Sequence, residues 1–205
     1  FLKIGSNVIH YRIKAYPNNK GGLSEIHFGL AELIDKMWQK RYFWQVTGVQ
    51  ITSALNFSLG IIAILAWFLW PKNTEYGYFG AAALLWAGHC MHYTMTEIPM
   101  AAVYWEILSA TALIWVGVMI FMFALRFYNQ RFPLAERLVW GFAVATPFLL
   151  WAAGELQLTI AASLCYLALL LIGVFVVKVL FDGARRERSV GASLLLVGCF
   201  MIVGL

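Results

Sequence analysis

Apolar residues follow one another in long runs after residue 45, and short polar stretches separate these runs. An α-helix rises 1.5 Å per residue, so about 20 apolar residues cross a hydrocarbon core of about 30 Å. Continuous runs of this length predict helices rather than alternating strands. The runs cover about 46–70, 138–153 and 158–181. Two more lie between Tyr76 and Tyr128, on either side of a loop from Thr94 to Ala102, and another begins near Val190. We therefore predict an all-α polytopic membrane helix bundle over residues 46–205, with five complete helices and a truncated sixth.

The N-terminal residues have a different period. Apolar and polar residues alternate from Val8 to Tyr16, which predicts a half-buried β-strand. A turn at 17–22 leads into a second short extended run from Leu23 to Phe28. Because two strands alone are only marginally stable, we expect residues 1–29 to be the end of a larger extracytoplasmic sheet that begins upstream.

A helical period begins after Gly29, and residues 30–45 are predicted to form an amphipathic linker helix. Tyr42, Phe43 and Trp44 follow its basic end and are typical of an aromatic belt at the membrane entry. We expect the apolar stripe to couple the outer sheet to the membrane helices, although a purely structural role is an equal alternative. The stripe consists of Leu30, Leu33, Ile34, Met37 and Trp38.

Composition and charge agree with a membrane protein. The 205 residues are 62% hydrophobic and 12% charged, whereas soluble domains are near half apolar and a quarter charged. The formal net charge of +5 does not indicate nucleic-acid binding, because the bundle's basic residues gather in alternate loops. Loops with Lys72, Arg131 and Arg185 are assigned to the cytoplasm, and the loops at Glu97 and Glu155, which lack Lys and Arg, to the outside. The N-terminal segment is then extracytoplasmic.

Candidate chemistry is limited to ionisable residues near the outer ends of the predicted helices. His89 and His92 are three residues apart, and Glu106 opens the following helix. Two histidines and a carboxylate can bind zinc, can form a pH-tuned pair, or can form a hydrogen-bonded cluster without further function. We predict no bound metal, no cofactor and no catalytic constellation in this segment. The candidates for ligand binding or signal relay are His89, His92, Glu97, Glu106 and Glu155.

Other residues in the apolar runs predict packing features. Thr52 and Asn56 share a face and are expected to bond neighbouring helices. Gly77, Gly80 and Gly88 are expected to permit close helix contacts. Pro147 is expected to kink the fourth helix. The three cysteines, Cys90, Cys165 and Cys199, lack metal or redox spacing and are predicted to be buried apolar residues.

Short signatures spread along the chain add a family resemblance. Gly21-Gly22-Leu23 precedes His27-Phe28-Gly29, Tyr42-Phe43-Trp44-Gln45 leads into the first membrane helix, 75–80 opens the second, and Arg126-Phe127 closes the third. In this layout the chain resembles the bacterial seven-transmembrane receptors with diverse intracellular signalling modules. The resemblance implies a periplasmic β-sandwich ending near residue 29, seven membrane helices and a cytoplasmic output domain, most often a histidine kinase or a diguanylate cyclase. The seventh helix and the output domain are not in this sequence, so the family's ligand and output residues cannot be assigned here.

The main functional hypothesis is a sensory module of the bacterial inner membrane that relays a periplasmic signal to a cytoplasmic output domain. Its partners would be the lipid bilayer, the upstream sensor domain and the downstream output domain, with dimerisation expected if the output is a kinase. The alternative is a small-molecule transporter or channel. The sequence shows neither a charged residue near the bilayer midplane nor matched, interrupted helices, which are the features expected of a transporter. A metalloenzyme built on His89, His92 and Glu106 is a third hypothesis.

Overall fold

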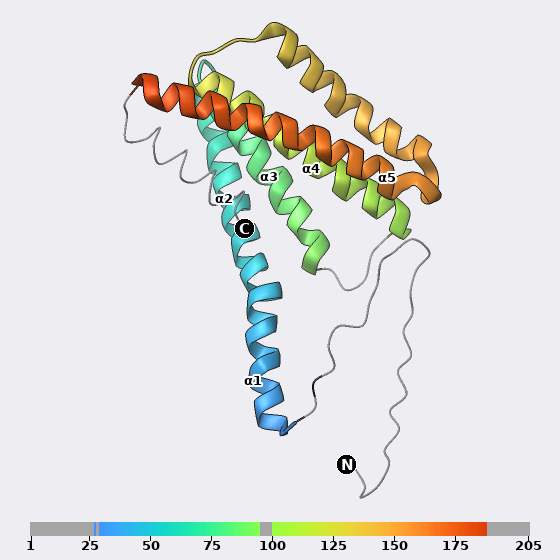
Figure 1. The fold of residues 1–205 in the computed structure, drawn as a ribbon. Helices are drawn as coiled ribbons and strands as arrows, with labels where there is room; N and C mark the ends of the chain where they lie inside the picture. Colours follow the sequence, from blue (N-terminus) through green and yellow to red (C-terminus); the bar gives the residue numbers. More distant parts are fainter. Residues whose placement is uncertain (1–26, 28, 95–99, 188–205) are drawn as a thin grey trace, which may run out of the picture.

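The computed structural model describes residues 27, 29–94 and 100–187, and the described secondary structure is entirely helical. The predicted strands lie outside these residues except for His27, which belongs to no strand, so the β segment stays a prediction. The chain folds into a string of helices in which α2 packs on α3, α3 on α4 and α4 on α5 (Figure 1). The elements are α1 (Ala31–Tyr42), η1 (Phe43–Thr47), α2 (Gly48–Leu69), α3 (Thr74–Thr94), α4 (Ala102–Phe127) and α5 (Pro133–Glu187).

Three helical segments are long and apolar enough to cross a membrane: Ala31–Leu69, Ala102–Phe127 and Pro133–Gly183. Pro133–Gly183 contains two of the predicted apolar runs. Two further runs coincide closely with α2 and α4. The remaining run corresponds to α3, which is less apolar and is mostly covered by its neighbours. The prediction of a helical membrane protein is therefore confirmed at this level.

The predicted linker helix and the first membrane helix form one continuous rod of 39 residues, Ala31–Leu69. Tyr42, Phe43 and Gly48 all have right-handed helical dihedrals, so the five-residue π-helix η1 joins α1 to α2 without a break. The rod ends at Trp70, which leaves the helical region one residue before Pro71. In Figure 1, α1 extends well beyond the other helices.

Small residues bring α2 and α3 into close contact. A Cβ added to Gly80 would lie 2.9 Å from the backbone oxygen of Gly60, and one added to Gly77 would lie 2.9 Å from the Trp67 ring. The predicted packing role is confirmed at these two glycines. At Gly88 it is wrong, because an added Cβ there would meet no atom within 4 Å.

The polar residues of α2 largely bond to their own helix. The hydroxyl of Thr52 donates to the Gly48 carbonyl at 2.8 Å, and the Asn56 amide donates to the Thr52 carbonyl at 2.9 Å. The expectation that both bond neighbouring helices was therefore wrong, because a carbonyl one turn back satisfies each group. Ser53 makes the interhelical bond instead, donating to the Ala87 carbonyl of α3 at 3.0 Å.

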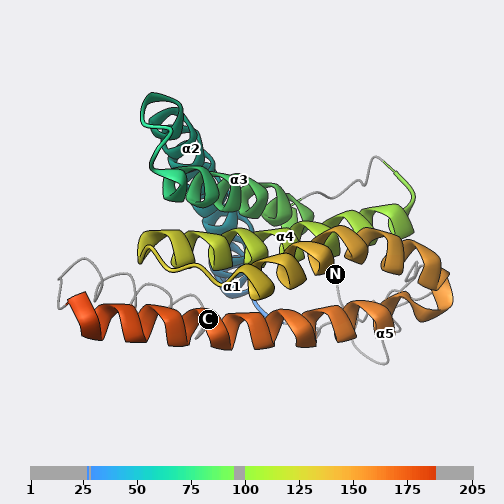
Figure 2. The same ribbon diagram turned by 90° about the horizontal axis from the view of Figure 1, so that it is seen from above.

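The best-buried core surrounds α4. Ile114, Val118 and Leu125 of α4 are fully buried, and they belong to a cluster with Ala143 and Leu180 of α5. Seen from above, α4 lies between α3 and the C-terminal part of α5 (Figure 2). A Cβ at Gly117 of α4 would overlap a terminal carbon of Leu169, so a larger residue there would have to displace this side chain.

Gly154 divides α5 into a first arm (133–153) and a second arm (155–187) that fold back on each other (Figures 1 and 2). Its φ of 61° and ψ of 179° are the non-helical dihedrals within α5. The predicted loop at 154–157 therefore reduces to a single residue. Pro147 lies inside the first arm without such a departure, so the chain reverses at the glycine and not at the proline.

Candidate functional site

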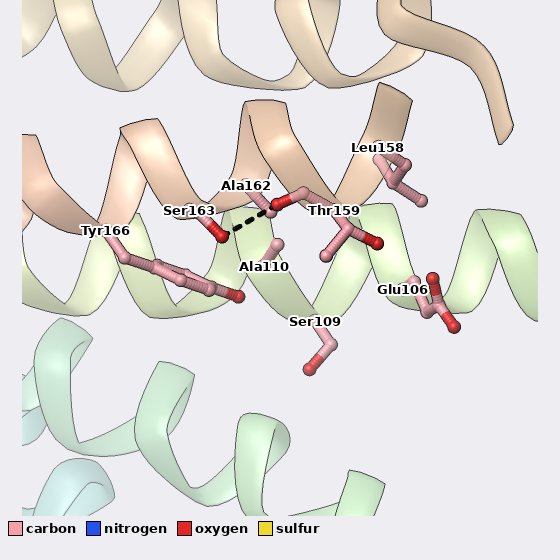
Figure 3. A pocket seen from close by; sticks show the side chains of 8 residues that line it. All are labelled: Glu106, Ser109, Ala110, Leu158, Thr159, Ala162, Ser163 and Tyr166. Carbon is pink, nitrogen blue, oxygen red and sulfur yellow. Dashed lines mark hydrogen bonds between the residues drawn. The ribbon is translucent and has the colours of Figure 1, made fainter. Parts of the chain in front are cut away.

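A partly polar cleft lies between α4 and the second arm of α5, close to Gly154 (Figure 3). Its volume is about 300 Å³. Apolar packing is incomplete here because the facing residues are small or polar: Ala110 and Ser109 on α4, and Ala162 and Ser163 on α5. The lining residues are Glu106, Ser109, Ala110, Leu158, Thr159, Ala162, Ser163 and Tyr166.

Glu106 supplies the one formal charge among the residues that line this cleft. It lies in the second turn of α4. Its side chain is half-buried and lies at the Leu158 end of the cleft, while Tyr166 closes the other end (Figure 3). The Ser163 hydroxyl donates to the Thr159 carbonyl at 2.8 Å, so this donor is used within its own helix.

His89 approaches α4 from the opposite side. It is only 7% exposed, and its Nδ1 lies 3.1 Å from both the carbonyl oxygen and the Oγ of Ser109. A protonated Nδ1 would donate to the carbonyl, whereas a bare Nδ1 would accept the hydroxyl proton. The ring also packs against Trp86, with centroids 5.8 Å apart.

Ser109 therefore links the two predicted candidates, since it contacts His89 and borders the cleft that holds Glu106. Ser109 and Glu106 are three residues apart and share a face of α4. The sequence interpretation missed Ser109 because a single serine in an apolar run most often bonds its own helix. The three-residue spacing between Glu106 and Ser109, which places both on one face of a helix, could have identified Ser109 from the sequence.

The other predicted site residues are placed differently. Glu155 is exposed beside the Gly154 turn, at the same end of the bundle. Glu97 lies outside the described residues, as does the side chain of His92, so the proposed His89–His92–Glu106 set is untested. Within the described part of the chain, no group of three or more His, Cys, Asp or Glu residues could hold a metal ion. Cys90 and Cys165 are buried free thiols, as predicted.

A second polar cluster lies at the opposite end of α4 and was also missed. The Arg126 guanidinium forms two bonds to the Glu136 carboxylate, Nη1–Oε1 at 3.1 Å and Nη2–Oε2 at 2.5 Å. The side chains are 17% and 16% exposed. From the sequence, Arg126 was interpreted only as a basic residue that helps to assign one end of its helix to the cytoplasm. A carboxylate in the first turn of the next helix, ten residues later, was the overlooked partner.

Comparison with protein-family models, with curated proteins and with solved structures gave no match. The chemistry of the site must therefore be argued from its residues. One carboxylate, several hydroxyls and a buried imidazole can bind a polar group or transmit a change in hydrogen bonding. No nucleophile with an adjacent base and no oxyanion site is formed by the described residues that line the cleft.

Proposed function

We propose that this chain is a transmembrane sensory module that relays an extracytoplasmic signal to a cytoplasmic output domain. The observation that carries the proposal is the uninterrupted rod from Ala31 to Leu69. A change in the position of α1 would be passed to α2, because the backbone keeps helical dihedrals on both sides of η1.

The exposed stripe on α1 supplies a surface for the upstream domain. Leu33, Met37 and Trp38 are 57%, 54% and 58% exposed. These side chains lie beyond the bundle, and no helix other than η1 makes extensive contact with α1 among the described residues. An apolar stripe of this kind is normally covered by a partner, and the predicted periplasmic sheet is the partner nearest in the sequence.

The remaining helices provide a path across the bundle. Close backbone contact couples α2 to α3, and the His89–Ser109 bond couples α3 to α4. The Arg126–Glu136 pair then fixes the end of α4 to the start of α5. Each contact joins consecutive helices, so a tilt of the rod would bias the arrangement of its neighbours in turn.

The rest of the proposal follows from the loop charges and the resemblance. The chain would lie in the bacterial inner membrane with α1 in the periplasm, and the output would be a histidine kinase in preference to a diguanylate cyclase. Kinase output would require a dimer. His89, Glu106 and Glu155 would lie at the periplasmic end of the bundle, where a polar cluster can respond to the outer domain.

The test is to introduce charges into the stripe of the full-length protein in its own membrane. Leu33→Asp plus Met37→Asp should change basal output, measured as autophosphorylation for a kinase or cyclic-dinucleotide synthesis for a cyclase. The matched control, Asp35→Asn plus Gln39→Glu, alters two exposed residues on the polar face of the same helix and should leave output unchanged.

Wild-type output in the charged-stripe variant, at equal membrane insertion, would refute the coupling role of α1. The transporter alternative makes a different prediction. It requires solute flux through the purified protein in liposomes, and flux reduced by substitutions in the bundle would replace the sensory proposal.

A further inference from the structure

Two apolar grooves flank α3 and meet at Gly88. The groove between α3 and α4 has a volume of about 670 Å³, and the groove between α2 and α3 has a volume of about 480 Å³. Leu84 and Gly88 line both. Volumes of this size, with mostly apolar walls, are typical of sites that bind small organic ligands.

Gly88 keeps this surface open. A Cβ added to Gly88 would meet no atom within 4 Å, whereas one added to Gly80, two turns earlier on α3, would collide with Ile64 and the Gly60 carbonyl. Gly80 is thus required for helix contact and Gly88 is not. A larger residue at position 88 would fill the groove without disturbing the neighbouring helices.

The imidazole and the hydroxyl that line the larger groove lie at one end. His89 and Ser109 border it near the Gly154 end of the bundle, while Trp115 and Met119 line it deeper along α4. Ser109 and Met119 are ten residues apart, or about 15 Å along the helix axis. A groove with a buried imidazole and a hydroxyl at one end and apolar walls for the remainder matches an amphiphile.

We propose that this groove binds one acyl-chain lipid, with an ester or hydroxyl group at His89 and Ser109 and the chain lying past Gly88 toward Met119. One wall of the groove is α4, which is long and apolar enough to lie in a membrane, so the surrounding bilayer would supply an apolar occupant. The polar end lies about 8 Å from the end of α3 along the helix axis. This proposal does not depend on the signalling role.

The test uses a phospholipid with a photoactivatable diazirine in its acyl chain, added in trace amounts to nanodiscs of phosphatidylethanolamine and phosphatidylglycerol that contain the full chain. After illumination, adducts are mapped by mass spectrometry. Label should concentrate on groove residues such as Leu84, Leu108 and Met119, relative to Leu149 and Leu171, which are exposed elsewhere on the bundle.

Gly88→Phe should reduce groove labelling about tenfold, because the new ring occupies the volume of the chain. The matched control is Gly141→Phe, another glycine with no atom within 4 Å of an added Cβ, and it should label like wild type. If Gly88→Phe lowers the unfolding midpoint, Leu108→Trp, which fills the groove from α4, replaces it.

Three results would overturn the proposal. Equal labelling of the groove residues and of Leu149 and Leu171 would show that the label comes from bulk lipid and not from a lipid bound in the groove. Undiminished labelling in both filling variants would place the lipid elsewhere. Protein cross-links from a photoreactive residue at position 88 to a second copy, or to residues 188–205, would assign the groove to a protein occupant. None of these results would bear on the coupling role of α1.

Discussion

At the scale of single residues, the Arg126–Glu136 pair is the strongest polar contact described here. Its two parallel bonds join a planar guanidinium to a carboxylate in the geometry that arginine favours. Glu136 also accepts the backbone N–H of Phe132 at 3.2 Å, so the same carboxylate caps the start of α5. The pair therefore holds the α4–α5 turn in one conformation.

Replacing Arg126 with alanine should destabilise the protein by about 3 kcal/mol, because Glu136 would remain largely buried without its partner. The double substitution Arg126→Met plus Glu136→Leu should recover most of this loss. The measurement is the free energy of unfolding in mixed detergent micelles, compared across the single and double variants in a mutant cycle.

Arg131→Ala provides the control, because Arg131 is exposed in the same turn and its removal should change stability by no more than about 0.5 kcal/mol. Equal losses for Arg126→Ala and Arg131→Ala would contradict the structural role of the pair.

The sequence alone could not distinguish the packing role of Gly80 from that of Gly88. Both lie in an apolar run with alanines nearby, and both favour close packing by the same rule. They differ because a Cβ at Gly80 would meet the α2 backbone, whereas one at Gly88 would meet no atom within 4 Å, which depends on the interhelical geometry. The sequence did identify His89 and Glu106 as lying at one end of the bundle, but not the serine between them.

At the scale of elements, the reversal at Gly154 separates the two arms of α5. A φ of 61° with a ψ of 179° belongs to a region of backbone space that is essentially restricted to glycine. The end of the first arm and the position of the turn were both predicted, because the apolar run stops at 153 and the expected loop begins at Gly154. That the reversal needs one residue rather than four was not predicted. Pro147 was expected to kink the first arm; it keeps helical dihedrals, and a membrane helix tolerates proline when its neighbours pack around it.

Gly154→Ala should destabilise the protein by about 1–3 kcal/mol, the cost of placing a side chain in this region. Spin labels on the two arms should show a broader distance distribution, since the variant would favour a continuous helix through the turn. Gly173→Ala is the control, because that glycine is helical and its added Cβ meets nothing within 4 Å. Loss of stability in the control alone would argue against this account of the turn.

At the scale of the whole molecule, the antiparallel succession of helices was predictable because loops between apolar runs were short and their charges alternated. The continuity of α1 with α2 was not, since the change from an amphipathic to a uniformly apolar pattern suggested two elements. Tyr42, Phe43 and Trp44 are compatible with a membrane interface whether the helix stops there or continues.

The proposed orientation can be tested by cysteine labelling of intact cells, after Cys90, Cys165 and Cys199 are replaced by alanine. A membrane-impermeant maleimide should react with Glu155→Cys, since Glu155 is exposed at the Gly154 end. Asn73→Cys, in the exposed α2–α3 turn, should react only after permeabilisation. The reverse pattern would place α1 in the cytoplasm and remove the basis for the receptor proposal.

The backbone contact between Gly60 and Gly80 has a mechanical consequence for the rod. No side chain separates the two helices there, so this crossing is the natural fulcrum about which the rod would pivot. From Gly60 the rod extends about 45 Å to Leu30 but only about 14 Å to Leu69. A displacement at the Leu30 end would arrive at Leu69 reduced about threefold and reversed in direction, with correspondingly greater force.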